Sequence, residues 1–259
     1  MSEGGSRVGR AIGCLALAGL GLACVAGMGV TLGRHAIVTS IAREELRARG
    51  LECDARFALE VSLALDQAIV APTTCTLTSG DVESIELVDP VRVELTGRTP
   101  TRVEGGAARI ALRDRGSFRA TGWGAILDAL AIPERLGAMV AGFGQLAGAG
   151  VPPIAMTSVE LVRGGQPMLA LGTLHADGSS PLGVTVERVD LPVIEGPMGA
   201  RARVQLTSVR STATASVVTM EALLDVDASM PMIGSLDQRR PVHVRVEGLD
   251  TDVPRWTVQ

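Results

Sequence analysis

The chain has 259 residues and a net charge of −4, and all 24 of its basic residues are arginine. The negative balance and the 2% content of aromatic residues argue against a nucleic-acid-binding protein, which needs a basic face and rings for base stacking. Lysine, asparagine and tyrosine are absent, which excludes a Walker A phosphate loop and a lysine Schiff base and indicates a GC-rich, bacterial genome.

The first predicted element is an uncharged run of 23 residues from Ala11 to Gly33. As a helix rising about 1.5 Å per residue, it is long enough to cross a hydrocarbon core of about 30 Å. We therefore expect a cytoplasmic tail at residues 1–10, a single transmembrane helix at residues 11–33 in the inner membrane, and the bulk of the chain in the periplasm. A cleaved signal peptide, or a lipoprotein cleaved before Cys24, is the alternative.

Charges beside this run give two opposed indications of its orientation. Four arginines lie at positions 34, 43, 47 and 49, and the positive-inside count would place that side in the cytoplasm. A short basic tail before a first apolar segment is instead typical of a signal anchor with its N-terminus inside. We favour the second orientation, because Glu44 and Glu45 are interleaved with the later arginines.

Small residues recur at four-residue spacing in the predicted membrane helix, at Gly19, Ala23 and Gly27. Such spacing lets two membrane helices approach closely, and it predicts a homodimer formed through the transmembrane helix. GC-rich codon usage explains the same residues equally well and remains the alternative.

Residues 34–50 are predicted to form a juxtamembrane helix. Ile37, Ile41 and Leu46 are interspersed with charged residues in a helical pattern, and Gly50 ends that pattern. This helix leads from the membrane segment into the rest of the chain.

Residues 51–259 are predicted to form an extracytoplasmic β-rich domain. Short segments of alternating apolar and polar residues are separated by turn signals such as Ser79–Asp81, Asp89-Pro90 and Gly105-Gly106. Their close spacing is typical of antiparallel hairpins and not of strand–helix–strand units. The predicted strands are Phe57–Leu63, Thr74–Thr78, Ser84–Val88, Val91–Leu95, Ala108–Leu112, Met156–Val162, a short segment beginning at Met168, Val184–Leu191, Ala202–Leu206, Ser216–Met220 and Pro241–Glu247.

A helical pair is predicted at about residues 121–148, inserted between the strands. No charged residue occurs from Leu136 to Val159. We expect this stretch to pack on the inner face of the sheet and to leave an apolar cleft, because several large apolar side chains in water would cost much of a domain's stability. Contact with the membrane surface or a bound acyl chain are the alternatives. The residues expected beside the cleft are Trp123, Leu127, Met139 and Phe143.

Cys53 and Cys75 are the two cysteines outside the apolar N-terminal run, 22 residues apart on neighbouring β-type segments. In an exported domain this pair predicts a disulfide, with buried free thiols as the alternative. A reactive thiolate is disfavoured because Glu52 and Asp54 flank Cys53.

The remaining candidate residues do not predict catalysis, a metal or a cofactor. His35, His175 and His243 are scattered without metal-ligand spacing, and no Gly-x-Ser-x-Gly elbow occurs. Residues 142–147 match a dinucleotide-binding pattern, but they follow a helical stretch and no strand–helix–strand frame is expected there. We expect a protein that is not an enzyme, with a membrane-tethered hydrolase using a dispersed triad as a less favoured alternative.

These elements predict an α+β, β-rich fold: an N-terminal transmembrane helix followed by an antiparallel β-meander domain with an inserted helical pair. The pattern resembles bacterial envelope proteins of the AsmA/TamB type, most closely over the hairpin stretch Ser84–Leu112. The resemblance implies an N-terminal anchor and a β-groove for phospholipid in the periplasm, although this chain is much shorter than a membrane-bridging groove. We expect a single-pass, membrane-anchored envelope protein that is structural or contacts lipid; a module binding an envelope protein partner is the alternative.

Overall fold

The computed structural model describes residues 34–258 apart from residues 49, 63, 79–81, 97–98, 114–131, 196–200, 231–233 and 250–254. The predicted tail, transmembrane run and homodimer seam all lie outside the described residues. Within the described part of the chain, neither helix has the length and apolar character needed to cross a membrane.

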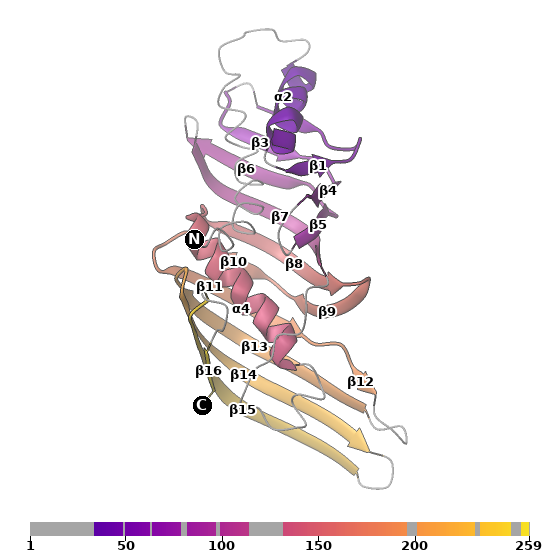
Figure 1. Ribbon diagram of the computed structural model, residues 1–259, viewed down its shortest axis with the longest axis vertical. Coiled ribbons are helices and arrows are strands. Elements are labelled where there is room, and N and C mark those ends of the chain that lie inside the picture. The colour runs from indigo at the N-terminus through magenta and orange to yellow at the C-terminus, as the bar shows by residue number, and fades with distance from the viewer. Residues whose placement is uncertain are drawn as a thin grey trace.

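The described residues form one large β-sheet with two helices, so the molecule is β-rich as predicted. The strands lie across the long axis of an elongated molecule, with helix α2 at one end and strands β14–β16 at the other (Figure 1). The elements of the N-terminal half are α2 (Arg34–Ala48), β1 (Leu51–Cys53), β2 (Leu59–Val61), β3 (Gln67–Val70), β4 (Thr73–Leu77), β5 (Val82–Leu87), β6 (Val91–Thr96) and β7 (Thr99–Leu112). The elements of the C-terminal half are α4 (Ile132–Ala149), β8 (Ile154–Arg163), β9 (Gln166–Leu171), β10 (Leu174–Ala176), β11 (Leu182–Asp190), β12 (Ile194–Glu195), β13 (Arg201–Ala213), β14 (Val217–Met230), β15 (Gly234–Glu247) and β16 (Arg255–Val258).

Helix α2 covers the N-terminal end of the sheet by packing on β1 and β2. Val38, Ala42 and Leu46 recur every four residues and are buried, so one stripe of the helix faces the core. Gly50 follows with a φ of +82° and donates its N–H to the carbonyl of Arg47, which ends the helix in the conformation that glycine favours.

Strand β7 is where the sheet branches. Its first half pairs with β6 and its second half with β5, so two branches, β6–β3–β2 and β5–β4–β1, leave the same edge of β7. Gly105 and Gly106 lie at this fork, where added Cβ atoms would collide with the side chains of Met156 and Asp89. The prediction of a turn at these glycines is therefore wrong: both lie inside β7, and the Asp89 side chain occupies the space that a Cβ at Gly106 would need.

Strands β7 and β8 are parallel, so the predicted purely antiparallel meander is also wrong. The reason is the long connection between them, which contains α4 and lets the chain re-enter the sheet in the same direction. On the exposed face, Arg109 of β7 pairs with Glu86 of β5 at 3.4 Å and Glu160 of β8 at 2.7 Å.

Of the predicted helical pair, the described residues contain α4, and the earlier part lies outside them.

The core consists of two apolar clusters that meet at the β7–β8 junction. One cluster is formed by α2 and the strands up to β7, and the other by α4 and the strands from β8 onward. Ile110, Leu112, Ile154 and Met156 pack against both clusters but remain only partly buried. The junction between the clusters is thus apolar and incompletely filled.

Candidate functional site

An apolar cavity of about 280 Å³ lies at this junction, between α4 and the inner face of β5, β7 and β8. Leu112 of β7, Leu161 of β8 and Val82 of β5 contribute to its walls, together with one face of α4. Its volume is just below the range of about 300–1,000 Å³ that small-molecule sites occupy. The cavity is the feature of the described residues best suited to hold a ligand.

Small residues on α4 create this space. Ala138, Ala141, Gly142 and Gln145 follow the helical spacing of one face and line the cavity. An added Cβ at Gly142 would meet no atom within 4 Å. The larger side chains of Leu136 and Val140 are buried in the C-terminal cluster, so α4 is anchored to the sheet while its small face leaves a void.

Two of the four residues predicted beside an apolar cleft line this cavity. Met139 and Phe143 are 2% and 3% exposed and contribute to its wall. Trp123 and Leu127 lie outside the described residues. The structure therefore brings Met139 and Phe143 together at the cavity, one helical turn apart.

Polar groups at the cavity come chiefly from arginine. Arg113 directly follows β7 and Arg163 is the last residue of β8, and both line the cavity. Leu112 is opposite Arg163 in the parallel register, so the two arginines leave the sheet at the same end. Arg113 donates hydrogen bonds from Nη2 to the carbonyl of Leu77 and from Nε to that of Val82. Sequence reasoning missed both arginines, because their convergence depends on parallel pairing.

The two predicted disulfide residues lie on β1 and β4, in the branch of the sheet beside α2. Cys53 of β1 is opposite Cys75 of β4 in the antiparallel register, and their sulfur atoms are bonded. The bond ties the start of the domain to the β5–β4–β1 branch beside α2. Its formation in the native compartment stays a prediction.

The loop after Cys53 is held by charged groups. Burial opposes ionisation of Asp54, but hydrogen bonds from the Thr73 hydroxyl and the Arg56 side chain, together with the Arg56 charge, outweigh it and lower the pKa of this carboxyl. The contacts are 2.7 Å from Thr73 Oγ1 to Asp54 Oδ1 and 2.8 Å from Arg56 Nε to Asp54 Oδ2. Asp54 therefore acts as a structural acceptor.

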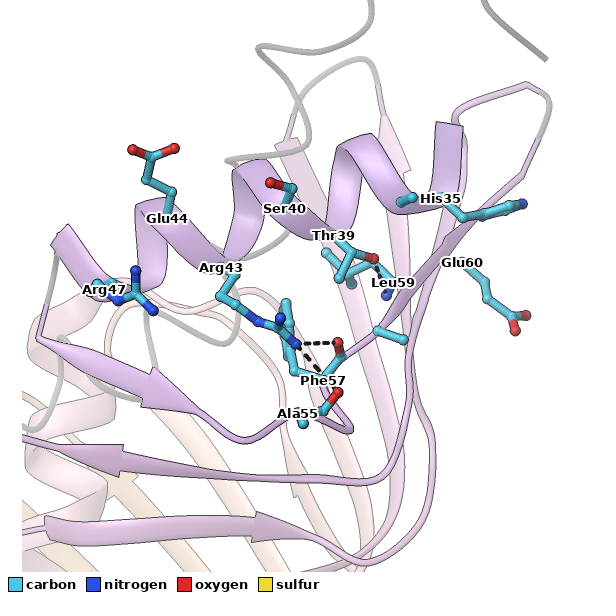
Figure 2. Close-up of a pocket in the computed structure, with 12 residues that line it drawn as sticks. His35, Thr39, Ser40, Arg43, Glu44, Arg47, Ala55, Phe57, Leu59 and Glu60 are labelled. Atoms are coloured by element: carbon cyan, nitrogen blue, oxygen red, sulfur yellow. Dashed lines mark hydrogen bonds between the residues drawn. The ribbon is translucent and has the colours of Figure 1, made fainter. Parts of the chain in front are cut away.

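A second, polar depression lies between α2 and the strand β2. Figure 2 shows Arg43 reaching from α2 to the loop carbonyls of Ala55 and Phe57, while Glu44 points away from the loop. Nη2 of Arg43 donates a hydrogen bond to the carbonyl oxygen of Phe57 at 3.0 Å, and the guanidinium carbon of Arg43 lies 5.9 Å from the centroid of the Phe57 ring. Arg43 thus fastens α2 to the loop.

His35 and His243 take structural positions, and His175 is an exposed residue of β10. His35 Nδ1 accepts a hydrogen bond from Val61 N at 3.2 Å, and His243 Nδ1 lies 3.6 Å from Glu221 Oε1 across the β14–β15 pair. No group of three potential metal ligands occurs among the described residues. The dinucleotide-like pattern at residues 142–147 falls inside α4 and not at its start, so it offers no helix N-terminus to a phosphate, although β7, α4 and β8 do form a strand–helix–strand unit.

Comparison with known proteins adds nothing to this geometry. No family model, curated protein or solved structure matches the chain. The resemblance to AsmA/TamB-type proteins stays a hypothesis, and the functional inference rests on the residues of the cavity.

Proposed function

We propose that this chain is a non-catalytic, single-pass membrane-anchored protein of the bacterial envelope that holds the acyl chain of a lipid in the cavity beneath α4. The observation that carries the proposal is the cavity itself, with its aliphatic wall and the small-residue face of α4. No cofactor is required for this function.

The energetic basis is the incomplete burial of apolar side chains around the cavity. Ile110, Leu112, Ile154 and Met156 keep part of their surface exposed although they belong to the junction of the two clusters. Removing apolar surface from water contributes about 25 cal/mol per Å², or about 0.8 kcal/mol per buried methylene group. An acyl chain gains this free energy by entering the cavity, and the protein gains better burial of the junction.

The membrane is the source of such a ligand under this proposal. The run Ala11–Gly33 supports an inner-membrane anchor, and α2 begins at the next residue of the chain. The domain would then face the periplasm within a short distance of the bilayer. An anchored chain stays in the membrane pellet after alkaline carbonate treatment and leaves only with detergent; release of the intact chain by carbonate contradicts the anchor.

Photo-cross-linking tests lipid binding directly. The full-length chain is placed in nanodiscs with hexadecanol that carries a diazirine near the middle of its chain, and labelled peptides are identified by mass spectrometry. The proposal expects labels within residues 138–146 and 154–163, the two segments that contribute most of the cavity lining from α4 and β8. Labels confined to residues 11–33 would instead mean that the probe meets only the membrane segment, and they would refute the proposal.

A protein-binding module is the second candidate, because β15 offers a free edge. Strand β16 pairs with residues 244–247 of β15, while residues 234–243 have a partner strand on the β14 side only, among the described residues. An exposed edge can accept a strand from another protein. Replacing Gln238 with proline would abolish such pairing and leave acyl-chain labelling unchanged.

A further inference from the structure

The cavity combines an apolar wall with two arginines. Arg113 and Arg163 stand at the ends of adjacent parallel strands, and no aspartate or glutamate is among the described residues that line the cavity. Arginine therefore supplies the charged side chains among the described lining residues, whereas the whole chain has a net charge of −4. This local reversal favours an anionic ligand.

The surroundings of Arg113 leave its charge without a carboxylate partner among the described residues. Its guanidinium donates to the carbonyls of Leu77 and Val82, which satisfy hydrogen bonds but carry no full negative charge. A guanidinium has five N–H donors, and a partly buried cation is stabilised most by an anion that accepts several of them. Gln145 on α4 adds an amide at the same cavity.

We infer that the cavity binds a single-chain anionic amphiphile, a long-chain carboxylate, whose head group lies between Arg113 and Arg163 and whose tail extends along α4. This inference rests on the proposed function and adds the ligand class. A volume of about 280 Å³ is small for a ligand site, which favours one acyl chain over the two chains of a diacyl phospholipid. The planar fork of each guanidinium matches a carboxylate in bidentate geometry.

The test compares two probes that differ only in their head group. The full-length chain in nanodiscs is labelled with diazirine-bearing hexadecanoic acid or with diazirine-bearing hexadecanol, and labelling of residues 138–146 is measured against probe concentration. A charge-assisted contact is worth about one tenfold step in affinity, so the acid should label at roughly tenfold lower concentration than the alcohol.

Substitutions of the two arginines test whether they cause the preference for the acid probe. R113Q and R163Q should each lower the ratio of acid labelling to alcohol labelling toward one, whereas R113K should keep part of the preference for the acid. R92Q is the matched control, because Arg92 is an exposed residue of β6 that does not line the cavity. Should R113Q not fold, R163Q and the two probes on the unaltered chain still decide the matter.

The outcomes separate this inference from the proposed function. Equal labelling of the cavity by acid and alcohol overturns the anionic ligand and leaves acyl binding standing. Absence of cavity labels with either probe overturns both. If a single-chain phospholipid competes with the labelled acid about tenfold better than unlabelled hexadecanoic acid does, the carboxylate is wrong and the head group is a phosphate.

Discussion

Replacement of Gly142 should stabilise the protein and close the cavity at the same time. Gly142 lies inside α4 on the cavity wall, and an added Cβ would have open space around it. Glycine in a helix interior costs about 0.8–1 kcal/mol relative to alanine, so Gly142→Ala should raise the free energy of unfolding by about that amount. Gly142→Leu should add part of the roughly 1.5–3 kcal/mol gained when such a side chain is buried.

Thermal unfolding of the full-length chain provides the measurement of stability. For a domain of this size each kcal/mol corresponds to about 2–4 °C in Tm. The expected rise is therefore about 2–4 °C for Gly142→Ala and about 4–8 °C for Gly142→Leu, if the leucine gains roughly another 1 kcal/mol. The alanine variant leaves most of the cavity open, whereas the leucine fills the space into which an acyl chain would extend.

Acyl-chain labelling distinguishes the two variants. The alanine variant should bind the hexadecanol probe as the unaltered chain does, and the leucine variant should lose most labels on residues 154–163. A leucine variant that is more stable and still labels fully would refute the placement of the ligand. A leucine variant that is less stable than the alanine variant would refute the existence of the open space at Gly142.

Three further predictions concern other parts of the chain. Replacing Cys53 and Cys75 with serine should lower stability by about 3 kcal/mol, the chain-entropy value for a closed loop of this length, and a melting curve unchanged from the parent would contradict the bridge. Gly106→Ala should destabilise by about 2–4 kcal/mol, because its Cβ displaces the Asp89 carboxylate that accepts the Ala107 N–H at 2.7 Å; a variant as stable as the parent in urea would contradict this. Since the folded state lowers the pKa of Asp54, its contribution to stability is present above the ordinary aspartate pKa and is lost as pH falls through the lowered value, so Asp54→Asn should flatten the acid side of the stability–pH curve.

Alternation and charge depletion predicted much of the secondary structure. Val91–Leu95 and Pro241–Glu247 read as half-buried strands and lie within β6 and β15, and the uncharged run after Leu136 gives most of α4. These signals are local, since each depends only on which side of one element faces the core. Burial of one face of a strand or helix is sufficient to produce the alternation or the depletion of charge that the sequence shows.

The pairing between distant strands leaves no comparable pattern in the sequence. The parallel arrangement of β7 and β8 depends on how the chain returns to the sheet after α4, and alternation within each strand is the same for either direction. The candidate ligand site could not be predicted for the same reason. Arg113 and Arg163 are fifty positions apart in the sequence, and they line one cavity because β7 and β8 pair in parallel. Met139 and Phe143 could be named in advance because they share one turn of a helix.

The glycines illustrate a second feature that the sequence alone does not predict, namely which glycine has a structural role. A chain with 31 glycines and a GC-rich bias invites the reading that each glycine reflects codon usage. Gly106 instead occurs where no Cβ fits, and Gly142 where a Cβ would meet empty space. At the first position a Cβ would displace the Asp89 side chain, whereas glycine at the second position lowers helix stability and leaves a void in the core. Glycine at position 142 thus lowers stability twice, by weakening the helix and by leaving a void. Such a residue is expected where a ligand fills the void, so Gly142 supports the placement of the proposed acyl chain beside α4.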